Sequence, residues 1–338
     1  MSAIAKAAGV GKATVSLALR NDPRLRRETC LRIQRIADKL GYRPNPVVSN
    51  LMAQLRASQT PNFQANLGLI NAAENPALLR DVDTFRLWTE GLIRGSAKQG
   101  YKMDEFWLHD PKTTPERLRK ILESRNIRGL VVAGILSNGA LDSKFDPIWE
   151  NIACVAVGLR PSHPRLHVAS NDQFSTALHA VEELRKRGYK RPGLVIETEV
   201  DENIDRRFSS GFWAGQNDLA VRNRIPPFPF RREDRVGFRK WFEKNRPDSI
   251  LSLHDQVRDW LRSFGVRVPA DIGLAHLDIT SGLEGWSGMD QNNELVGSSA
   301  VDLVVGQLHR NERGIPIHPK CVMVESVWVD GSTLRVSK

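Results

Sequence analysis

The chain has 338 residues and carries 49 Lys and Arg side chains against 39 Asp and Glu, a formal net charge of +10. This length exceeds what one ordinary core requires, so we expect two or three domains. No stretch approaches the roughly 18 consecutive apolar residues of a membrane-spanning helix, which excludes such a helix. The three cysteines match no metal spacing, and no signal-peptide pattern opens the chain, so the sequence predicts a cytoplasmic protein.

Most of the positive charge lies at the start of the chain. Residues 1–56 contain eleven Lys and Arg against three Asp and Glu, which accounts for +8 of the net +10. A small basic module beside a nearly neutral body is typical of proteins that bind the phosphates of nucleic acid. A solvated charged face is the alternative interpretation of the charge alone.

The apolar spacing in this basic segment predicts three short helices. The first ends at Gly9, which can adopt the left-handed conformation of a helix end. The second spans Lys12 to Leu19, and the third about Arg27 to Leu40. The inward positions are Ile4, Ala5, Ala8 and Val10, then Val15 and Leu19, then Ile33, Ile36, Ala37 and Leu40. The second helix would present short side chains outward, which suits a helix lying in a major groove.

Residues 46–64 predict a short helix followed by a polar linker. Pro46 can occupy the first turn of a helix, and apolar residues up to Leu55 follow it. An isolated helix of this length is only marginally stable in water. We therefore expect it to fold only against a partner.

From residue 67 onward, short apolar runs alternate with amphipathic segments. The predicted strands are 67–70, 129–133, 153–157, 193–196, 249–253 and 272–275, and the predicted helices include 88–99, 115–125, 175–187 and 258–264. Such alternation predicts an α/β fold with parallel sheets and right-handed crossovers. Ligands of such folds bind at the carboxyl ends of the strands.

The head resembles the headpiece of the lactose-repressor/galactose-repressor (LacI/GalR) family of transcriptional regulators. The resemblance rests on residues 4–21, on Glu28-Thr29 and on residues 41–45. It implies a helix-turn-helix that reads operator DNA, and a hinge residue, Leu51, that wedges into the minor groove. The DNA-binding residues it implies are Lys12, Ala13, Ser16 and Leu17 at base edges, with Arg20 on the same exposed face, and Thr14, Arg24, Thr29, Tyr42 and Asn45 at phosphates.

Two residues of the head depart from the family pattern. Gly11 stands where a capping Ser is usual, and Leu17 stands where relatives often carry Arg. Readout by Leu17 would have to be apolar, for instance against a thymine methyl group. These departures leave open an alternative function, a sugar-binding sensor whose degenerate headpiece no longer reads DNA specifically.

The body resembles the effector domain of the same family, which is similar to periplasmic sugar-binding proteins. The matching segments are 91–101, 127–129, 184–191, 265–272, 277–278, 290–291 and 296–297. The resemblance implies two lobes joined by three crossings, and it divides the chain as follows. Residues 1–45 form the headpiece, 46–64 the hinge helix and linker, and 65–338 the effector-binding and dimerisation domain, with lobe one at about 65–159 and 291–319 and lobe two at about 160–290 and 320–338.

Candidate effector-binding residues follow from strand ends and from chemistry. A sugar site combines an apolar face with a few convergent polar groups. Arg207 lies where relatives place a ligand-binding Arg, although three residues rather than two separate it from Gly211. The predicted effector residues are Asn71, Arg207, Asp255, Asp278 and Trp286. For each one, a surface polar, helix-capping or core role is the alternative.

No motif in the sequence predicts catalysis. His254 and Asp255 are adjacent, but neighbours in a strand point to opposite faces, so they are poorly placed as base and orienting group. We therefore predict no enzyme activity, no metal and no cofactor. The sequence as a whole predicts a cytoplasmic, homodimeric repressor that binds a near-palindromic operator and does not bind a membrane. Its small-molecule effector would be a carbohydrate, as the resemblance implies.

Overall fold

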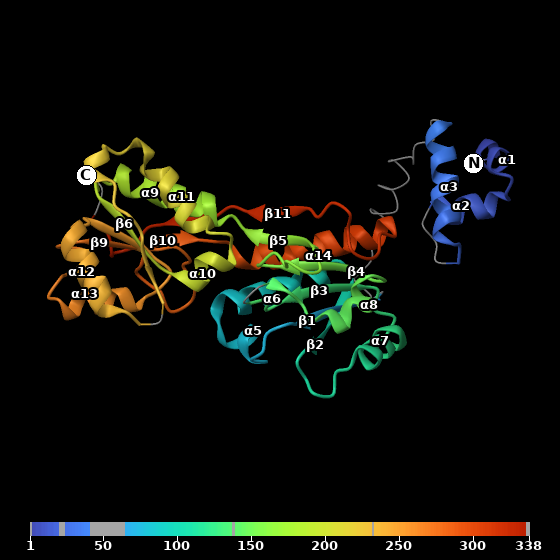
Figure 1. Ribbon diagram of the computed structural model, residues 1–338, viewed down its shortest axis with the longest axis horizontal. Helices are drawn as coiled ribbons and strands as arrows, with labels where there is room; N and C mark the ends of the chain where they lie inside the picture. The colour runs from blue at the N-terminus through green and yellow to red at the C-terminus, as the bar shows by residue number, and fades with distance from the viewer. Residues whose placement is uncertain (1, 20–23, 41–64, 137–138, 232, 336–338) are drawn as a thin grey trace.

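Figure 1 shows the computed structural model, which describes residues 2–19, 24–40, 65–136, 139–231 and 233–335. The described residues form a small helical head and a body of two α/β lobes. This agrees with the predicted fold class. The whole of the predicted hinge and linker, residues 46–64 with Leu51, lies outside the described residues.

The head consists of helices α1 (Ser2–Ala8), α2 (Lys12–Leu19) and α3 (Arg27–Lys39). Gly9 adopts the predicted left-handed conformation, with φ of +66°, and ends α1. The shared core is formed by Ile4, Ala5, Ala8, Val15, Ala18, Cys30, Ile33 and Ala37. The expected burial of Leu40 is wrong, because this residue lies beyond the end of α3 and is 50% exposed.

Side chains of α3 also close the ends of the two other helices. The Arg32 guanidinium donates to the carbonyl of Ala8 at 3.1 Å, and the Gln34 amide donates to the carbonyl of Ala18 at 2.9 Å. Carbonyls at a helix end have no partner within the helix, so such donors stabilise it. The third helix thereby fixes how α2 is presented to solvent.

Lobe one is built on a parallel sheet whose described strands run in the order β11-β5-β4-β3-β1-β2. Strands β3, β4 and β5 are buried at every residue, because helices cover both faces. The strands are β1 (Ala65–Asn71), β2 (Tyr101–Trp107), β3 (Gly129–Ala133), β4 (Ala153–Val157), β5 (His167–Asn171) and β11 (Cys321–Val324). The helices are α5 (Leu78–Asp81), α6 (Asp83–Lys98), α7 (Pro115–Ser124), α8 (Asp146–Trp149) and α14 (Asn293–Arg310), with a 3₁₀ turn at Ser143–Phe145.

Lobe two repeats this arrangement with strand order β12-β10-β9-β8-β6-β7, in which β12 is antiparallel to β10. Its strands are β6 (Pro192–Glu197), β7 (Phe228–Phe230), β8 (Ser249–Ser252), β9 (Gly273–His276), β10 (Ser287–Asp290) and β12 (Val327–Val329). Its helices are α9 (Gln173–Lys186), α10 (Thr198–Asn203), α11 (Arg207–Gly215), α12 (Arg235–Asn245) and α13 (Gln256–Ser263), with 3₁₀ turns at Gln216–Asp218 and Val221–Asn223.

The lobe boundaries differ from the expected ones. Within the described ranges the chain crosses between lobes after β5, between β10 and α14, and between β11 and β12. Strands β5 and β11 pair with the sheet of lobe one, so the expected ends of that lobe at about 159 and 319 are wrong. Strand β5 contains Ser170 and Asn171, which interrupt its apolar pattern, and β11 is a four-residue strand whose first three residues are exposed at the sheet edge.

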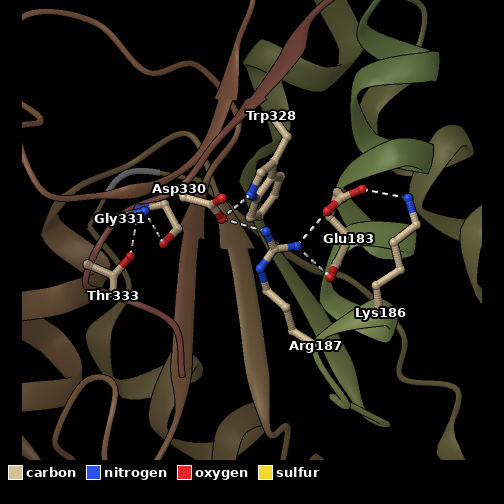
Figure 2. A network of polar contacts seen from close by, with 8 residues as sticks. Glu183, Lys186, Arg187, Trp328, Asp330, Gly331 and Thr333 are labelled. Carbon is tan, nitrogen blue, oxygen red and sulfur yellow. Dashed lines mark hydrogen bonds and ion pairs between the residues drawn. The ribbon is translucent and has the colours of Figure 1, made fainter. Parts of the chain in front are cut away.

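Past the third crossing, the chain is fixed to lobe two by Arg187, which follows α9 (Figure 2). The Arg187 guanidinium pairs with the carboxylates of Glu183 and Asp330, and it lies 4.6 Å from the centre of the Trp328 ring. The indole nitrogen of Trp328 donates to the same Asp330 carboxylate at 2.9 Å. One cation therefore holds β12 and the segment after it against α9.

Candidate DNA-binding head and inter-lobe site

The outward face of α2 is the candidate DNA-contact surface. Lys12 and Ala13 are exposed and Thr14 and Leu17 are partly exposed, whereas Val15 and Ala18 are fully buried. The short side chains of this face allow the helix backbone to approach a groove closely. Ser16 belongs to the same helix. Of the other predicted contacts, Arg24 is exposed and Thr29 is half-buried near the start of α3, and Arg20, Tyr42, Asn45 and Leu51 lie outside the described residues.

Two of the predicted effector residues, Asp255 and Asp278, follow β8 and β9 at the carboxyl edge of the lobe-two sheet, and Trp286, just before β10, contacts the end of β9. The imidazole of His276, the last residue of β9, lies 5.7 Å from the Trp286 ring, centre to centre. Its Nδ1 accepts a hydrogen bond from the backbone N–H of Asp278 at 3.1 Å. Asp255 lies at the start of α13, directly after the neighbouring strand, and is exposed.

Trp286 does not offer the open stacking face that the sequence predicted. It is 6% exposed and packs in the aromatic core of lobe two. The guanidinium of Arg258 lies 5.6 Å from its ring centre, and His276 meets it edge to face. Its role in the structure is therefore to support the residues at the sheet edge.

Asp278 is buried between the lobes. One carboxylate oxygen accepts from the hydroxyl of Thr84 at 2.7 Å, and the other accepts from the amide of Asn293 at 2.9 Å. Burial raises the pKa of Asp278 to about 6 in spite of these two donors, and the nearby carboxylates of Asp290 and Asp83 add to the rise. Thr84 lies on α6 of lobe one, so this carboxylate joins the two lobes.

Asn71 ends β1 and is fully buried within lobe one. Its amide donates to the carbonyl of Pro76 at 3.1 Å and to the Glu105 carboxylate at 3.2 Å. Its side-chain oxygen accepts from the backbone N–H of Ala73. Because its donors have partners, Asn71 shapes the loop after β1, and the structure does not bring it together with the residues around Asp278.

Arg207 begins α11 and faces residues of both lobes. Its guanidinium donates to the Asp172 carboxylate at 3.0 Å, while its buried Nε finds no partner among the described residues. Hydrogen bonds from Ser175 and Arg207 outweigh the effect of burial and keep the pKa of Asp172 below its usual range. A small cavity of about 30 Å³ lies beside Arg207 and is lined by Gly158, Arg160, Asn171, Asp205 and Met323 among others.

His254 is a candidate site residue that the sequence analysis considered only as half of a catalytic pair. Its Nε2 is buried and, within the described chain, lacks a hydrogen-bond partner. Burial, together with the neighbouring His276, lowers the pKa of its imidazole to about 4, so the ring is neutral at physiological pH. Its position directly after β8 was the signal in the sequence, since ligands of parallel sheets bind there.

The described residues contain no group of three or more His, Cys, Asp or Glu side chains placed to hold a metal ion. In the same ranges, no helix combines the length and the apolar character needed to cross a membrane.

A helix-turn-helix head joined to two parallel-sheet lobes with three crossings defines a class of bacterial transcription regulators with a periplasmic-binding-protein-like body. Residues 1–45 match the family model described as "Bacterial regulatory proteins, lacI family". The head therefore carries the domain of the LacI family of bacterial regulatory proteins.

Relatives of known structure or function extend this comparison to the body. The chain is 25% identical over 289 residues to the NTD biosynthesis operon regulator NtdR of Bacillus subtilis (strain 168), covering 81% of each chain. Its fold matches the transcriptional regulator CelR–cellobiose complex with a TM-score of 0.58 at 16% identity, over 98% of both chains. It matches the lac repressor dimer bound to operator and the anti-inducer ONPF with a TM-score of 0.57 at 16% identity, over 98% of this chain and 97% of that one.

Proposed function

We propose that this regulator is a cytoplasmic homodimeric repressor that binds a near-palindromic operator, and that a small molecule bound between its lobes controls its operator affinity. The observation that carries the second part is a pair of buried nitrogens that lack a hydrogen-bond partner among the described residues, Arg207 Nε at the start of α11 and His254 Nε2 just past β8. Buried polar groups are nearly always hydrogen-bonded in folded proteins. A ligand between the lobes would supply the missing partners.

On the DNA side, each head would lie with α2 in the major groove. Lys12, Ala13, Ser16 and Leu17 would face base edges, Arg20 would lie on the same face, and Thr14, Arg24, Thr29, Tyr42 and Asn45 would contact phosphates. The exposure of Lys12 and Ala13 supports this orientation. Leu51 would wedge into the minor groove at the operator centre when two hinge helices pair.

For the effector we propose a polyhydroxylated molecule of the carbohydrate class. A neutral imidazole can donate to or accept from a hydroxyl, and Arg207 adds donors, so the site suits hydroxyl groups. The CelR structure, a cellobiose complex, supports this class. Arg207, Asp255, Asp278 and His254 would bond the ligand, Trp286 would support His276 beside them, and Asn71 would shape the loop after β1 on the lobe-one side.

Operator binding is tested by titrating the protein with a palindromic site and with scrambled DNA at physiological salt. We expect much tighter binding to the palindrome and a steep salt dependence. Equal affinity for both would favour the sensor with a degenerate head and would refute the repressor.

Effector binding is tested by calorimetry with a panel of mono- and disaccharides that includes cellobiose. For a sugar that binds, Arg207→Ala and His254→Phe should each weaken binding by about tenfold or more, because each removes a buried hydrogen bond. Arg119→Ala on the outer surface is the matched control. Unchanged affinity in both site variants would place the pocket elsewhere.

A further inference from the structure

The carboxylate of Asp278 is held by two helices of the opposite lobe. Asp278 follows β9 in lobe two, whereas Thr84 lies in the first turn of α6 and Asn293 is the first residue of α14, both in lobe one. Asp278 is 5% exposed and Asn293 is 3% exposed. Each carboxylate oxygen therefore has one donor from the protein and little access to water.

Asn293 connects this carboxylate to two of the three crossings. Its side-chain oxygen accepts from the indole N–H of Trp88 and from the amide of Asn171, each at 3.0 Å. The Asn171 amide also donates to the carbonyl of Gln291 at 2.9 Å. Asn171 ends β5 at the first crossing, and Gln291 belongs to the second.

Asn292, the residue before Asn293, bonds the third crossing. The amide of Asn292 donates to the carbonyl of Glu325, between β11 and β12, at 2.9 Å. A more exposed contact lies at the edge of the same junction, where the Ser281 hydroxyl donates to Asp83 at 3.1 Å and accepts from Arg86 at 2.9 Å. The bonds around Asp278 thus share one network with the segments about which the lobes must rotate.

We propose that Thr84 and Asn293 are positioning residues that hold Asp278 in a clasp between the lobes, and that an effector hydroxyl must displace Thr84 to reach this carboxylate. This regulation rests on the proposed binding of an effector between the lobes. It follows from the geometry, because Thr84 and Asn293 each bond one carboxylate oxygen and burial leaves the carboxyl group little access to other donors. The Thr84 hydroxyl is part of α6, so its bond to Asp278 holds lobe one against lobe two. A ligand hydroxyl in its place would break that link, and the angle between the lobes would change.

Ionisation of Asp278 should oppose the clasp, because a buried carboxylate loses its hydration. The charged groups facing it are Asp83 with its partner Arg86 on α6, and Asp290 at the end of β10. Asp83 has a pKa below its usual range because Arg86 and Ser281 donate to it, so it stays ionised above pH 5. His276, the last residue of β9, has a lowered pKa through burial. The Asp278 carboxyl, with a pKa of about 6, therefore changes its charge between pH 5 and pH 8.

The experiment measures the lobe separation in the full chain without any ligand. One spin label is placed at Lys120 on α7 of lobe one and one at Lys240 on α12 of lobe two, because both residues are exposed. The distance between the two labels reports the separation of the lobes. Cys321, which is exposed, is first replaced by Ser, while Cys30 and Cys154 are buried. Labelled protein is mixed with a large excess of unlabelled protein. Each labelled chain in a dimer then has an unlabelled partner, and the measured distance is that within one chain.

Thr84→Val keeps the side-chain shape and removes the donor, and we expect at least an approximately tenfold fall in the ratio of clasped to open lobes at about pH 8. Thr84→Ser, which keeps the hydroxyl, should behave as the parent. Thr89→Val is the matched control, because Thr89 is also half-buried on α6 but bonds only the carbonyl of Phe85 in its own helix. In the parent, the clasped fraction should rise from about pH 8 to pH 5.

Asp278→Asn keeps an amide for Asn293 and Thr84 to bond and should remove the pH dependence of the distance. This variant decides the matter if Thr84→Val does not fold. A Thr84→Val distance equal to that of the parent, or an Asp278→Asn distance with the parent's pH dependence, would overturn the clasp. Because no ligand is used, that outcome would leave the proposed effector site standing, and failure of the calorimetric test would leave the clasp standing.

Discussion

Replacement of Asp278 by Asn is expected to stabilise the protein at neutral pH. Asn has the same shape, can accept from Asn293 with its oxygen and can donate to the Thr84 hydroxyl, so the geometry of the site is preserved. It removes the ionisable proton and with it the cost of burying a charge. The change therefore isolates the electrostatic part of the site.

The magnitude follows from the pKa of the buried carboxyl, which lies at about 6 against an ordinary value of 3.8. A pKa that is raised by folding means that the folded state binds the proton more tightly than the unfolded state. Stability from this group is then highest below about pH 4, falls as the pH rises to about 6, and stays low above it. At ~1.4 kcal/mol for each pKa unit, the loss for the parent at neutral pH is about 3 kcal/mol.

The assay is urea unfolding of the parent and the variant from about pH 4 to pH 8. Groups such as Asp172, whose pKa lies below its usual range, weaken both proteins in acid, so the informative quantity is the difference between the two unfolding free energies. That difference should grow by about 3 kcal/mol in favour of Asn across the range. Asp81→Asn, at a side chain that is 57% exposed, is the control and should show a flat difference. A flat difference for Asp278→Asn would refute the reasoning.

Three further substitutions test the packing of the body and the charge of the head. Arg187→Ala should lower the free energy of unfolding in urea by about 2 kcal/mol, because it leaves Asp330 and Trp328 without their shared partner. Arg119→Ala, which removes an exposed ion pair, is the control and should lower it by less than ~1 kcal/mol. Gly91→Ala should destabilise lobe one by about 3 kcal/mol or prevent folding, since the new carbon would lie 2.0 Å from the Glu294 carbonyl oxygen. Gly306→Ala is the control, because its new carbon meets only the end of the flexible Arg310 side chain, and its thermal melting temperature should match that of the parent. Arg24→Ala should weaken binding to all DNA sequences by a similar factor and reduce the salt slope of log K by about one unit, because Arg24 is expected to contact a phosphate, and an unchanged slope in gel-shift titrations would place it away from the backbone.

The head and the central strands could be predicted because local pattern alone determines them. Residues 129–133 and 153–157 are uninterrupted apolar runs, and both form strands over those same ranges because helices bury both faces. Strand β5 contains Ser170 and Asn171 and so lacks the continuous apolar run of a buried strand, whereas β11 is an apolar run of four residues whose place beside β5 no local pattern indicates. Without them, the expected lobe boundaries shifted by about one strand.

The candidate effector site was predictable only as a set of strand ends. Asp278 was found because it follows an apolar run, but its burial depends on Thr84, which is 194 residues away in the sequence. Likewise, nothing near Trp286 in the sequence indicates that Arg258 covers its ring. Contacts of this kind arise from the packing of whole elements, and a single sequence carries no local pattern for them.

Helix α14 provides a direct mechanical route from the inter-lobe junction toward the hinge. It begins at Asn293, which bonds Asp278, and its 18 residues span about 27 Å at the usual rise per residue. Gly91 and Gly297 bring α6 and α14 so close that an added carbon at either would meet the other helix's backbone at about 2 Å, which prevents the two helices from sliding independently. At the far end, Leu308 and Asn311 line the same cavity as Ala65 and Asn66, the first described residues after the hinge segment. A tilt imposed on α14 at Asn293 must therefore move the residues that lead into the hinge, and loosening the helix contact should weaken this coupling even where DNA binding and effector binding each remain intact.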